Sequence, residues 1–159
     1  MKIKFFIMDV DGTLTDGKIY MGETGELFKA FDIKDGCGIH DLLIPQNVIP
    51  IIITGRQSVI VENRCRELGI TEIYQNVHNK LDTLNRLMRQ NECSLSETAY
   101  IGDDINDISC MKEIKMSGGL VGCPFDASPE VKDLADFVCT KNGGNGAVRE
   151  FIEYVLSDK

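Results

Sequence analysis

Two aspartates, Asp9 and Asp11, directly follow the largely apolar run of residues 3–8. A short apolar run that ends at a turn signal predicts a buried strand. Carboxylates are unfavourable beside such a strand unless they are hydrogen-bonded, paired or bound to a metal. In α/β proteins, however, the carboxyl end of a parallel strand faces the crevice that binds ligands. The pair of aspartates therefore predicts a functional site.

Two further apolar runs, residues 48–53 and 98–101, also end in polar groups. Because the carboxyl ends of parallel strands share one edge of a sheet, we expect these groups to converge with the two aspartates. Lys80, at the start of a predicted helix, is placed to supply a positive charge. The polar groups are Thr54, Gly55 and Arg56 after the first run, and Asp103, Asp104 and Asp107 after the second.

Clustered carboxylates of this kind repel one another and raise one another's pKa unless a cation lies among them. Ligands that are all oxygen favour Mg²⁺, which also binds substrate phosphate. A metal, an attacking carboxylate, a lysine and hydroxyl donors are the components of a phosphoryl-transfer site. Each motif alone has a simpler reading, as a turn or a capped helix start. A calcium loop is disfavoured because its glycine and distal glutamate are missing.

The elements that must position these groups alternate between strand and helix along the chain. This alternation predicts a Rossmann-like, doubly wound parallel sheet in one domain, residues 1–159, with a β-hairpin inserted at residues 17–32. Helical patterns cover residues 36–44, 57–68, 79 onward, 105–114, 129–134 and 148–156. Further strands are expected at residues 73–74, 116–121 and 137–139.

The composition excludes several classes of protein. A net charge of −8 argues against a nucleic-acid groove and against an anionic membrane surface. No apolar run approaches the length of a membrane span, and the N-terminus lacks a signal-peptide cleavage site. Six cysteines without Cys-x-x-Cys spacing are expected to be reduced thiols. We therefore expect a cytoplasmic protein whose ligand is a small molecule.

Four segments resemble, in order, the four motifs of the haloacid-dehalogenase-like phosphatases: residues 9–13, residues 54–56, Lys80 and residues 102–107. Further segments resemble the small, capless subgroup, which includes phosphatases of 3-deoxy-D-manno-octulosonate (KDO) 8-phosphate and of nine-carbon sugar acids. The resemblance implies a homotetramer without a cap domain, in which hairpins build a central barrel and neighbouring subunits close the active sites. The further segments are residues 14–17, 31–36 and 143–150.

The resemblance also implies a role for each motif. Asp9 attacks phosphorus and becomes an aspartyl-phosphate. Asp11 protonates the leaving oxygen and then activates water. Lys80 neutralises developing charge and orients the nucleophile. Mg²⁺ is bound by Asp9, Asp103 and the carbonyl of Asp11, with Asp104 and Asp107 placing its waters, and phosphoryl oxygens are held by Thr54 and by the amides of Gly12 and Thr13.

The substrate implied by the resemblance is KDO 8-phosphate, an intermediate of lipopolysaccharide biosynthesis. Arg56, with neighbouring Gly55, is the natural bidentate partner for a sugar carboxylate, and an arginine here resembles the eight-carbon type. Lys34 stands where an arginine is common, and Arg149 is expected to reach a substrate site. The sequence ends soon after the last helix, without the longer tail of some relatives. A nine-carbon sugar-acid 9-phosphate is the alternative substrate, and a non-catalytic assembly module the alternative function.

Overall fold

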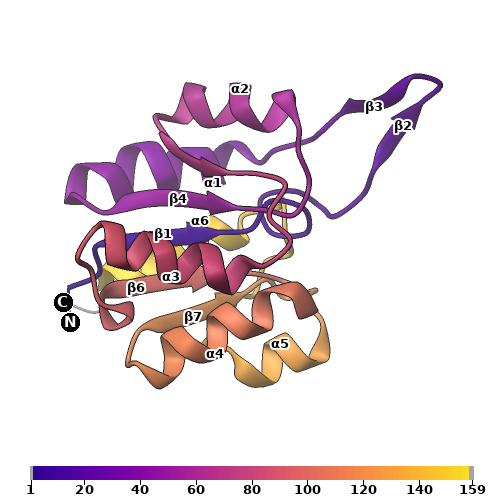
Figure 1. Cartoon of the computed structure of the whole chain (residues 1–159). Coiled ribbons are helices and arrows are strands. Elements are labelled where there is room, and N and C mark those ends of the chain that lie inside the picture. The colour runs from indigo at the N-terminus through magenta and orange to yellow at the C-terminus, as the bar shows by residue number, and fades with distance from the viewer. Residues whose placement is uncertain (1, 158–159) are drawn as a thin grey trace.

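The computed structural model describes residues 2–157 and contains a six-stranded sheet (Figure 1). Its strand order is β5-β4-β1-β6-β7-β8, and every pairing is parallel. This is the predicted doubly wound α/β architecture. Residue 1 and residues 158–159, the end of the predicted domain, lie outside the described range. The strands are β1 (Phe5–Met8), β4 (Ile49–Ile53), β5 (Glu72–Tyr74), β6 (Thr98–Ile101), β7 (Leu120–Cys123) and β8 (Phe137–Val138).

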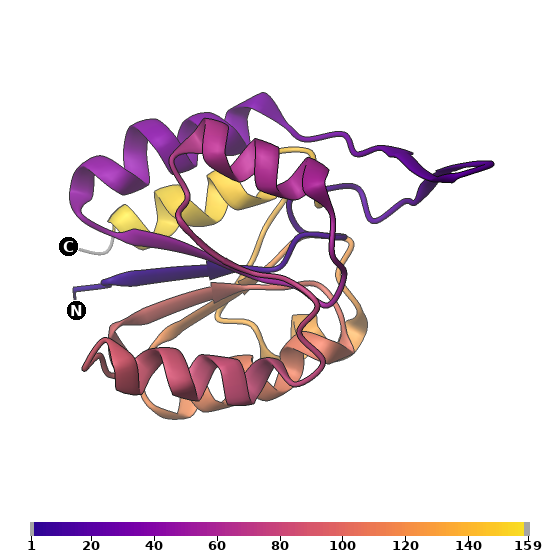
Figure 2. The same cartoon turned by 45° about the horizontal axis from the view of Figure 1, so that its top comes forward.

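Helices cover both faces of this sheet (Figure 2). Successive side chains of β1 point to opposite faces, so Phe6 and Met8 join one core cluster while Phe5 and Ile7 join the other. The first cluster includes side chains of α2 (Val59–Leu68), of α6 (Ala147–Ser157) and of the helical segment that continues α1 (Ile33–Cys37). The second lies under α3 (Lys80–Gln90), α4 (Ile108–Met116) and α5 (Pro129–Leu134).

Two predicted elements are displaced along the chain. The helix expected from residue 36 begins at Ile33, because the Asp32 carboxylate caps the amides of Lys34 and Asp35 at 2.7 and 3.1 Å. It continues through a π-helical segment, Gly38–Leu43, and a 3₁₀ turn, Ile44–Gln46. The strand expected at residues 116–121 is β7, at 120–123. Helix α4 extends to Met116, and Gly118, at φ +89°, turns the chain into the strand.

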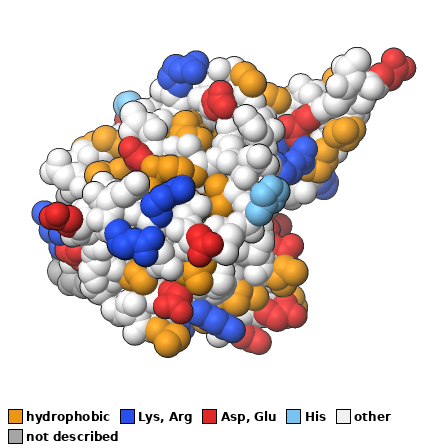
Figure 3. All heavy atoms as spheres, in the orientation of Figure 1, with side chains coloured by type: hydrophobic (Ala, Val, Ile, Leu, Met, Phe, Trp, Pro, Cys, Tyr) orange, Lys and Arg blue, Asp and Glu red, His pale blue; other side chains and the backbone are white. Residues whose placement is uncertain are grey.

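The predicted insertion is an antiparallel hairpin of β2 (Tyr20–Gly22) and β3 (Gly25–Phe28), which projects from the body of the molecule (Figure 1). The rings of Tyr20 and Phe28 stack with centroids 4.4 Å apart. Met21 and Leu27 are nevertheless 61% and 62% exposed. Figure 3 shows hydrophobic side chains on the surface of this projection. Within residues 2–157 there is no cap domain, and no helix combines the length and apolarity that spanning a bilayer requires.

Candidate active site

The predicted polar groups meet where β4, β1 and β6, three adjacent strands, reach their carboxyl ends. An open cavity of about 170 Å³ lies at this edge. Parallel strands bring together residues that are up to about a hundred positions apart in the sequence, as the spacing of the motifs led us to expect. The cavity is lined by Asp9, Asp11, Thr54, Gly55, Arg56, Asp103, Asp104 and Asn106.

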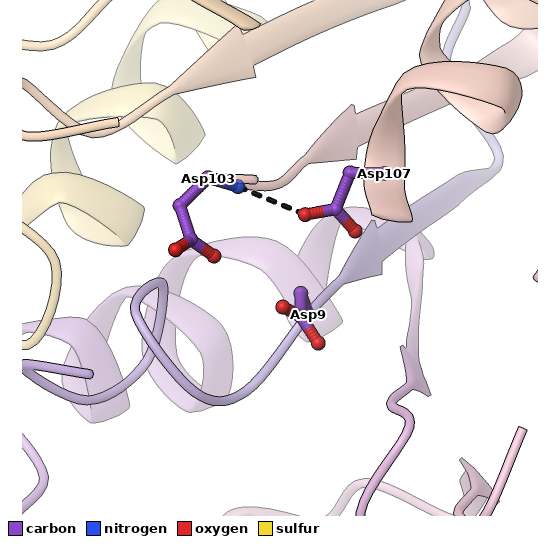
Figure 4. Close-up of side chains that lie close together, drawn as sticks. All are labelled: Asp9, Asp103 and Asp107. Atoms are coloured by element: carbon purple, nitrogen blue, oxygen red, sulfur yellow. Dashed lines mark hydrogen bonds between the residues drawn. The ribbon is translucent and has the colours of Figure 1, made fainter. Parts of the chain in front are cut away.

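Three carboxylates, those of Asp9, Asp103 and Asp107, cluster at this edge of the sheet (Figure 4). One oxygen from each lies within 4.8 Å of the others. The ammonium of Lys80, whose side chain is 2% exposed, lies 3.0 Å from Asp9 Oδ1 and 2.8 Å from Asp107 Oδ1. Lys80 is the first residue of α3 and Asn79 caps that helix, so the helix start places the ammonium at the edge of the sheet.

Asp107 is held by further hydrogen bonds from the protein. The Tyr100 hydroxyl donates to Oδ1 at 2.7 Å, and the amides of Asp103 and Asp104 donate to Oδ2 at 3.0 and 3.2 Å. Both oxygens of Asp107 are therefore engaged by protein groups, which suits a supporting carboxylate. Tyr100 was not predicted, because a tyrosine inside an apolar strand gives no signal beyond core packing.

The electrostatics of the site fit a divalent cation. Burial, together with Asp107, raises the pKa of Asp9 to about 6, although Lys80 opposes the shift. Burial and the charge of Asp9 raise the pKa of Asp103 to about 8. Burial alone would lower the pKa of Lys80, but its two carboxylate partners raise it. Clustered oxygen donors with excess negative charge are what Mg²⁺ binds, so the residues present fit this ion.

The loop after β1 packs closely against Asp103. Gly12 has φ +89°, and a Cβ at this position would overlap the Asp103 carboxylate. The Thr13 hydroxyl donates to Asp103 Oδ1 at 2.9 Å. From the other side, Gly143 has no room for a side chain against the Gly12 carbonyl, and the Gly144 amide donates to the Thr13 carbonyl at 3.1 Å. The glycine-rich loop before α6 therefore supports the loop that carries the two aspartates.

Asp11 faces the hairpin rather than the carboxylate cluster. Lys29, just after β3, places its ammonium 2.6 Å from Asp11 Oδ1 and 3.1 Å from Glu26 Oε2. Arg56, which lines the cavity and is 45% exposed in its side chain, lies 3.5 Å from the same Glu26 oxygen. Lys29 and Glu26 were not predicted, because charged residues in a hairpin are ordinary surface features.

Four predicted substrate residues do not line this cavity. Gly12 and Thr13 belong to the loop after β1 that packs against Asp103, and the other two are Lys34 and Arg149. Lys34 and Arg149 lie beside each other, where Arg149 Nη1 donates to the Lys34 carbonyl at 3.4 Å. Arg149 Nε also donates to Glu153 at 2.6 Å. The structure thus brings together the catalytic and metal-binding candidates but leaves Lys34 and Arg149 elsewhere on the surface of the described chain.

Comparison with known proteins identifies the family. A model of haloacid dehalogenase-like hydrolases matches residues 66–152. The chain is 42% identical to 3-deoxy-D-manno-octulosonate 8-phosphate phosphatase KdsC of Escherichia coli strain K12, over 97% of this chain and 79% of the relative. The chain belongs to the haloacid dehalogenase-like hydrolases. The resemblance that its four motifs indicated is confirmed.

Solved structures of haloacid dehalogenase-like hydrolases agree with this assignment. The KDO 8-phosphate phosphatase of Yersinia pestis superposes with a TM-score of 0.91 at 41% identity, covering 98% of this chain and 81% of that one. The Moraxella catarrhalis enzyme, solved with magnesium, phosphate and KDO, gives 0.90 at 41% identity, covering 98% and 86%. This chain is a phosphoric monoester hydrolase with the capless haloacid dehalogenase-like fold.

Proposed function

We propose that this hydrolase converts KDO 8-phosphate to KDO and inorganic phosphate, with Mg²⁺, through an aspartyl-phosphate. The observation that carries the proposal is the position of Asp9. Its carboxylate is held by Lys80 at an open cavity, and Asp11 and Arg56 line the same cavity. The identity of 42% to KDO 8-phosphate phosphatases over nearly the whole chain supports the choice of substrate.

In the first step Asp9 attacks phosphorus, and the bond between phosphorus and the sugar oxygen breaks. Asp11 gives its proton to the leaving oxygen. In the second step water attacks the phosphorus of the aspartyl-phosphate, Asp11 takes the proton of this water, and phosphate leaves with Asp9 regenerated. Lys80 offsets the negative charge near Asp9 in both steps, since its ammonium already contacts that carboxylate.

Asp9, Asp103 and the carbonyl of Asp11 would hold the Mg²⁺ ion, with Asp104 placing its waters. Asp107, which was also expected to place waters, accepts four protein hydrogen bonds and would instead support the site through Lys80. When bound, the ion neutralises the charge of the phosphoryl group and stabilises its transfer. The buried, mutually repelling carboxylates support this assignment.

The remaining predicted groups bind and orient the substrate. We assign the phosphoryl oxygens to the Thr54 hydroxyl and to the amides of Gly12 and Thr13. In this structure the two amides donate to Thr15 Oγ1 at 3.3 Å and to the Val10 carbonyl at 3.1 Å, respectively. Arg56, next to Gly55, forms a forked pair with the carboxylate of the sugar acid. Its exposure at the cavity supports this role.

The active unit is a homotetramer in the cytoplasm, with a place in lipopolysaccharide biosynthesis. Exposed apolar side chains on the hairpin, among them Met21 and Leu27, support its burial against other subunits. Lys34 and Arg149, which lie away from the cavity of their own chain, act at the site of a neighbouring subunit. Each subunit of the tetramer is the single domain predicted for residues 1–159.

A phosphate-release assay tests the proposal. The purified protein with Mg²⁺ is given KDO 8-phosphate, a nine-carbon sugar-acid 9-phosphate and simple sugar phosphates. We expect KDO 8-phosphate to give the highest kcat/KM, and Asp9→Asn to reduce its turnover by about 10⁴-fold or more. Asp133→Asn, an exposed aspartate on α5, should retain wild-type activity. Preference for the nine-carbon substrate would overturn the choice of substrate, and an active Asp9→Asn variant would refute the nucleophile.

A further inference from the structure

The side chain of Lys29 is only 2% exposed, although it belongs to the projecting hairpin. Its ammonium contacts two carboxylates, Asp11 at 2.6 Å and Glu26 at 3.1 Å. These two carboxylates are themselves 21% and 13% exposed. Lys29 is therefore a nearly buried cation that joins the hairpin to a residue of the catalytic loop.

The contact constrains how Asp11 presents its carboxyl group. Lys29 donates to Oδ1, which restricts the directions in which the carboxyl group of Asp11 can turn. Glu26 fixes Lys29 in turn. Its Oε2 accepts from Lys29, while its Oε1 accepts from the Ser58 hydroxyl at 3.4 Å, at the start of α2. The hairpin is thus connected to the body of the molecule at two points, Asp11 and Ser58.

Stability alone gives a poor reason for this arrangement. Removing two charges from water offsets most of the attraction between them, and apolar replacements of buried pairs are often equally stable. A fixed geometry is the other property that a buried, multiply hydrogen-bonded ion pair supplies. A misplacement of about 1 Å in a reacting group lowers a rate by about 10²-fold. The proton donor is the group in this site whose orientation the Lys29 contact controls.

We propose that Lys29, supported by Glu26, is a positioning residue that orients Asp11 for proton transfer to the leaving group. This inference rests on the proposed function, since it takes Asp11 as the acid and base of phosphate-ester hydrolysis. It gives the hairpin a second role beside assembly, because the strand that presents Leu27 to a neighbouring subunit also carries Glu26 and leads into Lys29.

The leaving group provides the test. A sugar alcohol needs a proton to depart, whereas nitrophenolate leaves without one. Single-turnover release of the leaving group is measured with excess enzyme and Mg²⁺, for the sugar phosphate that the wild type turns over best and for p-nitrophenyl phosphate. For Lys29→Met we expect the sugar phosphate rate to fall about 10- to 100-fold. The nitrophenyl rate should stay within about 3-fold, because that step does not depend on general acid catalysis.

Three variants complete the design. Lys29→Arg keeps the cation and should recover most of the sugar phosphate rate. Lys18→Met, an exposed lysine of the same insertion, is the matched control and should behave as wild type. Glu26→Ala keeps Lys29 and should show the same selective loss at about 3- to 10-fold, so it carries the test should Lys29→Met not fold.

Equal losses on both substrates, or no loss on either, would overturn the positioning role. These results can be told apart from failure of the proposed function. In that case the wild-type protein itself would release phosphate from neither substrate. Circular dichroism and the mass in solution, recorded for each variant, confirm that rates are compared between folded proteins of the same assembly.

Discussion

Two buried lysines pair with Asp9 and Asp11, the two aspartates that we propose as catalytic, and they come from different parts of the molecule. Lys80 and Lys29 each have a side chain 2% exposed, and each contacts two carboxylates. Lys80 begins a helix packed on the sheet and contacts Asp9. Lys29 follows a strand of the projecting hairpin and contacts Asp11. The proposed nucleophile is thus held by the core, and the proposed proton donor by an insertion.

This difference indicates how firmly each group is held. The partners of Lys80 follow β1 and β6, two central strands of the sheet, so packing of the whole domain fixes their separation. The hairpin forms a sheet of its own with two strands, which is marginally stable alone and gains rigidity from contacts. We expect the geometry around Lys80 to depend on the fold of the single chain. The geometry around Lys29 should depend on subunit assembly as well.

Lys80→Met should produce the largest effect among the tests of this comparison. It leaves Asp9 beside Asp107 without their shared cation, and the transition state without its ammonium. We expect kcat to fall about 10²- to 10³-fold on both the sugar phosphate and p-nitrophenyl phosphate, measured in steady state with Mg²⁺. A loss confined to the sugar phosphate would place Lys80 with Lys29 and remove the distinction between them.

The same variant also tests whether a buried ion pair contributes more to the free energy of unfolding than an exposed one. Removing the buried ammonium of Lys80 should lower the free energy of unfolding by about 3–5 kcal/mol in urea titrations without metal. Lys115→Met is the matched control, because Lys115 pairs with Asp136 at 2.8 Å but is 40% exposed in its side chain. That exposed pair should contribute about 0–1 kcal/mol. Equal losses would show that burial is not what distinguishes the two pairs.

Charges on the outer surface of the hairpin should have a smaller effect on catalysis. The double variant Met21→Glu, Leu27→Glu places carboxylates where we propose subunits meet. We expect light scattering to report a mass below that of a tetramer. The sugar phosphate rate should fall about 10-fold, because the hairpin would no longer hold Lys29 in a fixed position.

Met116→Glu is the control for this variant, because Met116 is 81% exposed at the end of α4 and outside the hairpin. It should change neither mass nor rate. A dimer or monomer that retains full activity on the sugar phosphate would show that assembly does not hold Lys29 in place.

The sequence predicts the Lys80 side of the site well, for a physical reason. Apolar runs that end in Asp9, Thr54 and Asp103 predict parallel strands, and the carboxyl ends of such strands share one edge. The meeting of these residues therefore follows from local patterns and a general rule of α/β topology. Lys80 itself was identified only by its order among the four motifs.

The Lys29 side could not be predicted in this way. Its contact with Asp11 depends on how the hairpin leaves the domain, and strand alternation does not determine that direction. Tyr100 was missed because its hydroxyl finds Asp107 only through the turn that follows β6. The start of β7 was misplaced because an apolar residue, Met116, belongs to the preceding helix and only Gly118 marks the turn.

A third buried acid, Asp35, provides the test with the smallest expected effect. Its carboxylate accepts a hydrogen bond from the backbone amide of Arg149 at 2.8 Å, whereas Asp9 and Asp11 each contact a lysine ammonium. Burial raises the pKa of Asp35 from 3.8 to about 6. The folded state therefore holds a proton that the unfolded chain has lost, so ionisation of Asp35 lowers the free energy of unfolding as the pH rises from about 4 to about 6.

Asp35→Asn removes this dependence. Relative to wild type, the variant should gain about 1–3 kcal/mol of stability between pH 4 and pH 7, measured by urea unfolding at each pH. Asp133→Asn, an exposed acid on α5, should follow the wild-type curve throughout. A constant difference between Asp35→Asn and wild type across this range would mean that Asp35 stays ionised when buried. A carboxylate would then remain charged inside this fold without an ammonium partner. The pairing of Lys80 and Lys29 with their aspartates would need a reason other than charge.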